Sequence, residues 1–499
     1  MFDRFSPKGF EVVYVGAFET PVSCDAWRQA FDLPFPVVAD EDGALFRKLT
    51  NGWVPCNLLV APDGTVLFAE DDFDEDGYAT AIAGIYEQTE TPPPSADTTA
   101  RRRGPSEAAR IVILGGGVGG VVAAHHLRRR LPDQHRIVVI DRSAHHLYSS
   151  SLLWLMVGER SEEQIRRPLT ALSERGIEYH RGEVEAIDLS RRVVRTPSDA
   201  FDFDYLIVSL GAEHAPQTIA GFDTMAHDLY SVEGCKGIHR ALEAFEGGTI
   251  GVLVPSMPFK CPAAPYEAAF LIDAFCRKKG VRDATQIHLF TPEHQPMPVA
   301  GVELGNAVTQ MLEARGIGYN PLFTFDSLRP DDGESHSGEP HSGEIVASDG
   351  RAERVDLLLA VPPHRAPQVI RDSGLLGVSG WVHVDPHTLR TEHEGVFAIG
   401  DVTTIKLPDG KALPKAGVFA HYEAKVVAEQ IAAEVRGRSS RASFDGKGYC
   451  FIELGNGKAG FAGGRFYAEP EPKVRMRRPG RLWHWGKVAF ETWWLRHWF

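Results

Sequence analysis

The chain has 499 residues, with 53 Lys and Arg against 67 Asp and Glu, which gives a formal net charge of −14 at pH 7. This length predicts more than one domain, and the acidic balance argues against a nucleic-acid partner because phosphate contacts require a basic surface. Six cysteines are too few for a disulfide scaffold and their spacing matches no zinc signature, so we expect no metal site. No leader sequence opens the chain and no apolar stretch reaches about 18 residues, so we expect a cytoplasmic protein whose membrane association is peripheral.

Residues 1–88 predict a small α/β module. FEVVYVGAF and NLLVAPDGTVLFAE are typical of strands, the second turning at Pro-Asp-Gly, with a helical DAWRQAF between them. Together with LPFPVVADEDGALFRKL and Trp53-Val-Pro55, this order resembles part of a thioredoxin-like domain without its first strand and redox CxxC. Cys24 and Cys56 are either a redox pair or, as we favour, buried small hydrophobic residues. We expect a structural or docking role for this truncated module; an upstream start is the alternative.

Residues 89–108 have the Pro, Ser, Thr and Arg bias of a linker. The main body then opens with IVILGGGVGG, in which an apolar run leads into Gly115-x-Gly117-x-x-Gly120 and a helical VVAAHHLRRRL. This pattern predicts a strand, a glycine turn and a helix whose N-terminus binds a pyrophosphate. The next apolar run ends at Asp141, about twenty residues on, where a carboxylate binds a ribose hydroxyl. A dinucleotide-binding unit follows; a glycine turn that serves only packing is the alternative.

Two later segments complete this unit. The apolar run LIVSLGA ends at Gly211, and VFAIGDV places Gly400 and Asp401 directly after another predicted buried strand. An acid at that point can bind a cofactor hydroxyl. The alternation of strands and helices predicts an α/β nucleotide-binding domain. These segments also resemble those of the two-dinucleotide-domain flavoproteins, which implies an α/β protein with two Rossmann-like domains. We expect the first domain at 109–215 and 375–440, a second and degenerate one at 216–374, and a C-terminal membrane-interface region at 441–499.

The segment AIGDVTTIKLPDGKALPKAGVFAHYEAKVVA resembles the FAD-contacting segment of the sulfide:quinone oxidoreductase family, and the resemblance runs from about Ala109 to the C-terminus. Lys415 and Gly417 match that family's Pro-Lys-x-Gly motif beside the isoalloxazine ring, where a cation and a helix N-terminus stabilise reduced flavin. A surface lysine on a capped helix is the alternative for Lys415. The resemblance implies that FAD is bound by Gly115, Gly117, Gly120, Asp141, Gly211, Gly400, Asp401, Lys415 and Gly417.

The second domain lacks the glycine turn of a nicotinamide site. TIGVLVP is followed by SMPFKCPAAPYEAAFLIDAFCRKKG, a strand and a helix joined by a segment in which a pyrophosphate would meet Pro258, Phe259 and Pro262. We therefore expect nicotinamide binding to be absent or poor. Cys261 stands in this segment, after Lys260 and before the predicted helix, where the helix dipole and a cation favour a thiolate. A buried packing cysteine is the alternative.

KCPAAPYE resembles the active-site segment of the same family, which implies a redox role for Cys261 and proton handling by Glu267. A glutamate in a first helical turn is as readily explained as a complement to the helix dipole. Cys450, in FDGKGYCFIELGNGKAG, matches the family's second redox cysteine. The resemblance implies that sulfide attacks a disulfide, a persulfide forms, and the freed thiolate passes two electrons to the flavin. Ser231 stands nearest to the third cysteine that some members carry.

Other candidate residues have plainer interpretations. The segment 331–350 repeats His-Ser-Gly-Glu and predicts a solvated hairpin loop rather than a metal site. His294 and His364 are expected to be loop or structural residues. Cys276 falls within a predicted helix and is expected in the core, and Cys235 matches no role in the resembling family.

The last residues, 479–499, read PGRLWHWGKVAFETWWLRHWF. Aromatic residues at helical spacing flanked by cations are the pattern of an amphipathic helix in a membrane interface. Packing on the protein's own core or on a second subunit is the alternative. The aromatic residues are Trp483, Phe490, Trp494 and Trp498, and the cations are Arg481, Lys487 and Arg496.

We therefore expect a flavoprotein on the inner face of the cell membrane that oxidises sulfide, or a related small sulfur compound, and reduces membrane quinone. Three alternatives are a single-subunit NADH:quinone oxidoreductase, the flavin subunit of a cytochrome-linked sulfide dehydrogenase, and a non-catalytic redox-sensing or docking flavoprotein. The sequence leaves the oligomeric state open, a homo-oligomer included.

Overall fold

The computed structural model describes residues 108–331 and 342–499 and, before them, short segments within residues 14–70. The chain forms two compact units, Met1–Gly104 and Pro105–Phe499. The first unit contains a parallel strand pair, β1 (Tyr14–Ala17) with β2 (Val37–Asp40), and an antiparallel pair, β3 (Asn57–Val60) with β4 (Val66–Glu70). Most of the predicted thioredoxin-like module, including Cys56, lies outside the described residues, as do the linker at 89–107 and the histidine repeat at 332–341.

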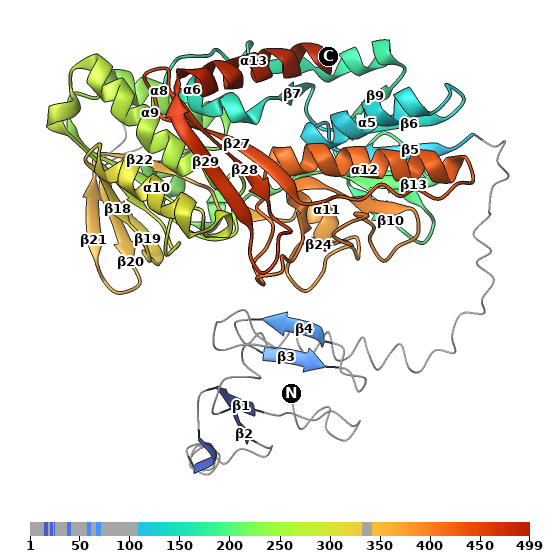
Figure 1. The fold of residues 1–499 in the computed structure, drawn as a ribbon, viewed down its shortest axis with the longest axis horizontal. Helices are drawn as coiled ribbons and strands as arrows, with labels where there is room; N and C mark the ends of the chain where they lie inside the picture. Colours follow the sequence, from blue (N-terminus) through green and yellow to red (C-terminus); the bar gives the residue numbers. More distant parts are fainter. Residues whose placement is uncertain are drawn as a thin grey trace. The chain divides into compact units, whose positions relative to one another are not determined.

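In the second unit, five parallel strands form the sheet that carries the glycine motif, in the order β25-β13-β5-β6-β9 (Figure 1). The strands are β5 (Arg110–Leu114), β6 (Arg136–Asp141), β9 (Glu178–Arg181), β13 (Tyr205–Val208) and β25 (Val396–Ala398). Both faces of this sheet are covered, so β5 is a continuous apolar run. Its residues 111 and 113 pack into one hydrophobic core, and residues 112 and 114 into another.

Helices cover one face of this sheet. Helix α5 (Val118–Arg130) packs on β6, and α12 (Gly417–Val435) lies along α5, as Figure 1 shows. The core on the other face includes residues of a small antiparallel sheet. Its strands are β10 (Ala186–Asp188), β11 (Val193–Arg195) and β12 (Ala200–Asp202).

A second five-stranded parallel sheet has the order β15-β22-β16-β17-β18. Its strands are β15 (Ala226–Asp228), β16 (Gly248–Leu253), β17 (Thr285–Phe290), β18 (Ile317–Asn320) and β22 (Leu357–Ala360). Its accompanying elements are the helices α8 (Val232–Ala244), α9 (Ala264–Lys279) and α10 (Val302–Glu313) and the antiparallel strands β19 (Phe325–Pro330), β20 (Gly343–Ala347) and β21 (Ala352–Val355). The two parallel sheets with their helices confirm the predicted α/β class with two Rossmann-like domains.

The C-terminal region forms an antiparallel sheet followed by a helix. The elements are β27 (Lys447–Glu453), β28 (Ala459–Arg465), β29 (Lys473–Gly480) and α13 (Arg481–His497). Helix α13 packs on the body of the protein, and Trp494 and Trp498 are each only 2% exposed. The prediction that these two indoles face a membrane is therefore wrong, as is the placement of Lys487 among surface cations, because its side chain is also buried. No helix within the described part of the chain is long and apolar enough to span a bilayer.

Candidate active site

The connection between β5 and α5 folds the glycine motif into a tight turn. Gly115 has a φ of +101°, and its N–H donates to the Ile140 carbonyl at 2.8 Å. A Cβ on Gly120 would lie 1.9 Å from the Gly115 carbonyl oxygen, so a side chain cannot fit there. A Cβ on Gly117 would meet nothing within 4 Å, which leaves the backbone bare just before the helix. The turn therefore offers open backbone at the place where this motif binds a pyrophosphate.

Asp141 ends β6 beside this turn. Its Oδ2 accepts a hydrogen bond from the Gly116 N–H at 2.5 Å, and its Oδ1 accepts one from the Ser143 N–H at 2.7 Å. Burial raises the pKa of Asp141, although both N–H donors act to lower it. A carboxylate can accept about four hydrogen bonds, so this one retains capacity for a ribose hydroxyl.

Asp401 follows β25 in the short turn Gly400–Val402. The Gly400 N–H donates to Glu423 Oε2 at 2.7 Å, which fixes the turn against α12. Burial raises the pKa of Glu423 to about 7. Asp401 Oδ1 is buried and finds no hydrogen-bond partner among the described residues. Because a buried acceptor without a partner is costly, this oxygen suits a cofactor hydroxyl. Glu423 was missed from the sequence, because it is one of three glutamates in this helix and no local pattern distinguishes it from the other two.

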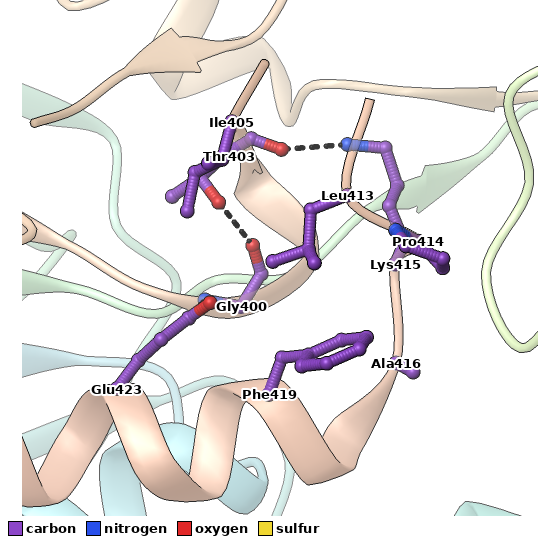
Figure 2. A pocket seen from close by; sticks show the side chains of 9 residues that line it. All are labelled: Gly400, Thr403, Ile405, Leu413, Pro414, Lys415, Ala416, Phe419 and Glu423. Atoms are coloured by element: carbon purple, nitrogen blue, oxygen red, sulfur yellow. Dashed lines mark hydrogen bonds between the residues drawn. The ribbon is translucent and has the colours of Figure 1, made fainter. Parts of the chain in front are cut away.

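Lys415 is an internal cation rather than a surface lysine. Its Nζ donates to the carbonyls of Asp401 and Thr403, both at 2.9 Å, and lies 3.3 Å from the centroid of the Trp381 ring. Burial lowers its pKa to about 7, although the carboxylates of Asp401 and Glu423 act to raise it. Figure 2 shows Lys415, Thr403 and Glu423 among the residues that line a cavity of about 10 Å³, which has room for about one water molecule. That cavity is therefore too small to be the cofactor site itself.

The remaining predicted cofactor residues lie at element ends. Gly211, just after β13, has a φ of +69° and open space where a Cβ would project. Gly417 begins α12, and a Cβ on it would lie 3.5 Å from Val118, which begins α5. The N-termini of both helices therefore lie side by side, and their dipoles favour negative charge at this point.

These features fit FAD. The bare glycine turn suits the pyrophosphate, the unpartnered oxygen of Asp401 suits a hydroxyl of the cofactor, and the paired helix N-termini suit its anionic parts. The residues that would hold the cofactor are Gly115, Gly117, Gly120, Asp141, Gly211, Gly400, Asp401, Lys415 and Gly417.

The two predicted redox cysteines come from different segments. Cys261 lies in the loop between β16 and α9 with a φ of +49°, and its N–H donates to the Lys415 carbonyl at 2.6 Å. Cys450 lies in β27 with an exposed side chain, and both thiols are free. Negative charge on Cys261 raises the pKa of Cys450, and negative charge on Cys450 raises the pKa of Tyr148. The fold thus brings Cys261 within electrostatic range of Cys450 and bonds it to the Lys415 segment.

The expectation that Cys261 is held as a thiolate is wrong for this structure. Burial raises the pKa of the Cys261 thiol to about 12, and the charge of Glu267 raises it further, while Lys487 acts to lower it. The pKa of Cys450 is also raised: although the residue as a whole is exposed, the surrounding protein desolvates its thiol, and the charges of Cys261 and Glu267 add to the shift. Helix α9 begins three residues after Cys261, and Lys260 does not offset these effects.

Glu267 lies in the first turn of α9 and is buried. Its Oε1 accepts hydrogen bonds from the backbone N–H of Glu453 at 2.7 Å and from Lys487 Nζ at 3.0 Å. The side chain therefore does more than complement the helix dipole, because it joins α9 to β27 and α13. Lys487 and Glu453 were not identified as site residues from the sequence, since their partners are remote along the chain.

The ten residues between β16 and α9 contain no glycine, and Phe259 among them is 2% exposed. In the first turn of the helix, the Tyr266 hydroxyl donates to Glu293 Oε2 at 2.6 Å, just beyond the end of β17. Burial raises the pKa of Glu293 to about 7. The segment that would bind a second pyrophosphate is thus filled by the protein's own side chains.

The other sequence candidates have structural roles. Cys24, Cys235 and Cys276 are buried, which confirms the core prediction for Cys276. Ser231 caps α8 by accepting a hydrogen bond from the Gly234 N–H at 3.0 Å. His364 is buried with its Nδ1 2.7 Å from the Pro362 carbonyl, and His294 is an exposed loop residue. Among the described residues, no group of three His, Cys, Asp or Glu side chains could hold a metal ion.

Comparison with known proteins places this site in context. The chain is 27% identical over 282 residues to the mitochondrial sulfide:quinone oxidoreductase of Mus musculus, a match that covers 54% of this chain and 60% of that protein. It is 23% identical to the type II NADH:quinone oxidoreductase of Staphylococcus haemolyticus, over 62% of this chain and 78% of that protein. The crystal structure of the Aquifex aeolicus sulfide:quinone oxidoreductase superposes with a TM-score of 0.70 at 23% identity, covering 78% of this chain and 92% of that one.

The match to the mouse protein spans 60% of that protein's length, and a similar match to the Dictyostelium discoideum sulfide:quinone oxidoreductase also spans 60%. The family model for pyridine nucleotide-disulphide oxidoreductases matches residues 109–424, which include both parallel sheets and all nine predicted cofactor residues. FAD is the cofactor of this family. The chain therefore belongs to the pyridine nucleotide-disulphide oxidoreductase family, and it is an FAD-dependent oxidoreductase.

Proposed function

We propose that this protein oxidises sulfide, or a related small sulfur donor, at a Cys261–Cys450 redox pair and delivers two electrons to a membrane quinone. The observation that carries the proposal is that two thiols from separate segments lie within electrostatic range of each other, and that one of them, Cys261, is hydrogen-bonded to the Lys415 carbonyl. The similarity to the sulfide:quinone oxidoreductases of mouse and of Aquifex aeolicus supports the same substrate class.

In the proposed reaction, HS⁻ attacks one sulfur of the Cys261–Cys450 disulfide, and the S–S bond breaks to leave a persulfide on one cysteine and a thiolate on the other. FAD, when bound, accepts the two electrons that the thiolate gives up as the disulfide is restored. In total, each HS⁻ loses one proton and two electrons, and its sulfur leaves as zero-valent sulfur. Glu267 is the proposed proton acceptor because its charge acts on both thiols.

The outer face of α13 supports a membrane acceptor. Leu482 and Trp485 are 70% and 67% exposed, and Phe490 and Trp493 are 42% and 44% exposed. Residues 473–499 contain seven Lys or Arg and one Glu, although the whole chain is acidic. Exposed indoles bordered by cations favour binding to an anionic lipid surface. We therefore propose a peripheral location on the inner face of the cell membrane.

The second candidate is an NADH:quinone oxidoreductase, which the similarity to the Staphylococcus haemolyticus enzyme favours. Against it stand the filled connection before α9 and the hydrogen bond between Tyr266 and Glu293, since a dinucleotide needs bare backbone at this place.

The two candidates differ in their reductant, so the test is anaerobic mixing of the purified flavoprotein with sulfide or with NADH while the flavin absorbance is followed. We expect fast bleaching by sulfide that is lost in Cys261→Ser and Cys450→Ser and kept in Cys276→Ala, a control in the core of α9. Fast bleaching by NADH that is indifferent to both cysteines would replace the sulfide assignment with the second candidate. A variant without residues 1–88 tests whether the N-terminal module takes part in turnover.

A further inference from the structure

Helix α13 buries two charged side chains against the protein and leaves several apolar side chains at the surface. Lys487 and Glu491 are each 5% exposed, whereas Trp485 is 67% exposed. Glu491 pairs with Arg160 at 2.8 Å, and Lys487 pairs with Glu267 at 3.0 Å. Since an unpaired buried charge is costly, both pairs anchor the helix. One of the two pairs also faces the thiol site.

Three elements meet at a single oxygen atom, Oε1 of Glu267. Lys487 Nζ of α13 lies 3.0 Å from it, and the backbone N–H of Glu453 in β27 donates to it at 2.7 Å. Glu267 itself lies in α9, which follows the loop of Cys261, and β27 is the strand that contains Cys450. The C-terminal helix therefore delivers a cation to the junction of the two segments that carry the thiols.

The two charges at this junction shift the pKa of both thiols in opposite directions. Glu267 raises the pKa of Cys261 and of Cys450, and Lys487 lowers both. Lys487 remains cationic, because its pKa is raised: burial acts to lower it, but Glu267 and Glu453 outweigh burial. The titratable groups around this ammonium are Glu267 from α9, Glu453 and Cys450 from β27, Cys261 from the preceding loop and His484 from α13, whose Nδ1 lies 3.0 Å from Glu453 Oε2.

We propose that Lys487 is a positioning residue of the thiol site: docking of α13 places its ammonium against Glu267, where it stabilises the thiolate forms of Cys261 and Cys450. This role bears on turnover only if the proposed sulfide oxidation at Cys261 and Cys450 is correct, so the proposal rests on the proposed function. The thiolate is the form of cysteine that reacts with a disulfide or transfers electrons. The same helix that presents indoles to the surface thus supplies a charge that the redox pair requires.

The test measures alkylation of Cys261 and Cys450 by iodoacetamide in the reduced full-length holoprotein, by peptide mass spectrometry from neutral to alkaline pH. Lys487→Met is expected to slow alkylation of both cysteines about tenfold near neutral pH, since one pKa unit changes the thiolate fraction tenfold. Glu267→Gln is expected to speed it. The double variant is expected to fall between the two, and Lys487→Arg is expected to restore much of the wild-type rate.

The matched control is Arg160→Met, which breaks the other buried ion pair of the same helix but is not among the charges that act on either thiol. If Arg160→Met and Lys487→Met slow alkylation of the cysteines equally, the proposal is overturned, because Lys487 then only holds the helix in place. Unchanged reactivity in Lys487→Met, or slower reactivity in Glu267→Gln, would do the same. If Lys487→Met does not fold, Glu267→Gln and the double variant decide. The alkylation assay uses no sulfide. Failure of the proposed function would be seen in a different experiment, as the absence of flavin bleaching by sulfide, so the two failures can be told apart.

Discussion

A hydrogen-bonded chain links the C-terminal helix to the glycine turn of the cofactor site. The Trp494 indole N–H donates to His146 Nε2 at 3.1 Å, and His146 Nδ1 lies 2.9 Å from the Gly116 carbonyl oxygen. An indole N–H can only donate, so Nε2 accepts and the imidazole proton is on Nδ1, where it bonds to Gly116. All of this is buried, with Trp494 2% and His146 1% exposed. The sequence contains no local signal for this contact.

Trp494→Phe keeps an aromatic ring at the site and removes the donor. His146 Nε2 is then buried without a partner, which is expected to lower the free energy of unfolding by about 1–3 kcal/mol. Trp494→Ala also removes the buried ring and is expected to cost about 3–5 kcal/mol. For a unit of this size, each 1 kcal/mol lowers the melting temperature by roughly 1 °C. A loosened Gly116 turn is expected to weaken FAD binding up to about tenfold, which corresponds to about 1.4 kcal/mol.

The assay compares urea unfolding of the apoprotein and FAD titration of wild type, Trp494→Phe, Trp494→Ala and Trp493→Phe. Trp493 is the matched control because it neighbours Trp494 on the same helix but is 44% exposed. We expect wild-type values for the Trp493 variant and a graded loss for the other two. If Trp494→Phe matches wild type in both stability and FAD affinity, the hydrogen-bonded chain does not contribute as argued.

Three further predictions concern the cofactor turn, pH and the membrane surface. Gly120→Ala is expected to prevent a stable FAD-binding domain, since its Cβ would lie 1.9 Å from a carbonyl oxygen, whereas Gly117→Ala is expected to fold normally and lose FAD affinity. Thermal unfolding and FAD titration distinguish the two variants, and equal behaviour of both would contradict the geometry. Burial lowers the pKa of His146 from 6.5 to about 4, so the unfolded state binds more protons than the folded state between these two pH values. The free energy of unfolding therefore falls as the pH falls through this range, by roughly 3 kcal/mol at its lower end. His146→Gln is expected to flatten this part of the pH profile of stability. Replacing the exposed Trp485 and Trp493 together by Gln is expected to reduce co-sedimentation with anionic vesicles several-fold without changing FAD content, and undiminished binding would place the lipid contact elsewhere.

The nucleotide turn was predictable because its determinants are local. The apolar strand, three glycines, the helix and Asp141 occupy one continuous stretch, and the steric demand at Gly120 arises from a neighbour five residues away. Such contacts follow from chain geometry alone. The segments of Gly211 and Asp401 were likewise marked by a small residue or an acid after an apolar run, whereas Lys415 was identified only by the resemblance of its Pro-Lys-x-Gly segment to a known family.

The tertiary structure decided which side of each element faces its partner. Helical periodicity identified α13 as an aromatic helix, but its indoles occur around the whole circumference, so only docking showed that Trp494 turns inward and Trp485 outward. Burial of Lys487 became favourable only because Glu267, from a remote helix, lies 3.0 Å away. The state of Cys261 depends on burial, on Glu267 six residues away in the same segment, and on Lys487, whose approach no local sequence pattern contains. Local geometry thus determined the cofactor turn from sequence, whereas the electrostatics of the thiol site arose from contacts between residues far apart in the chain.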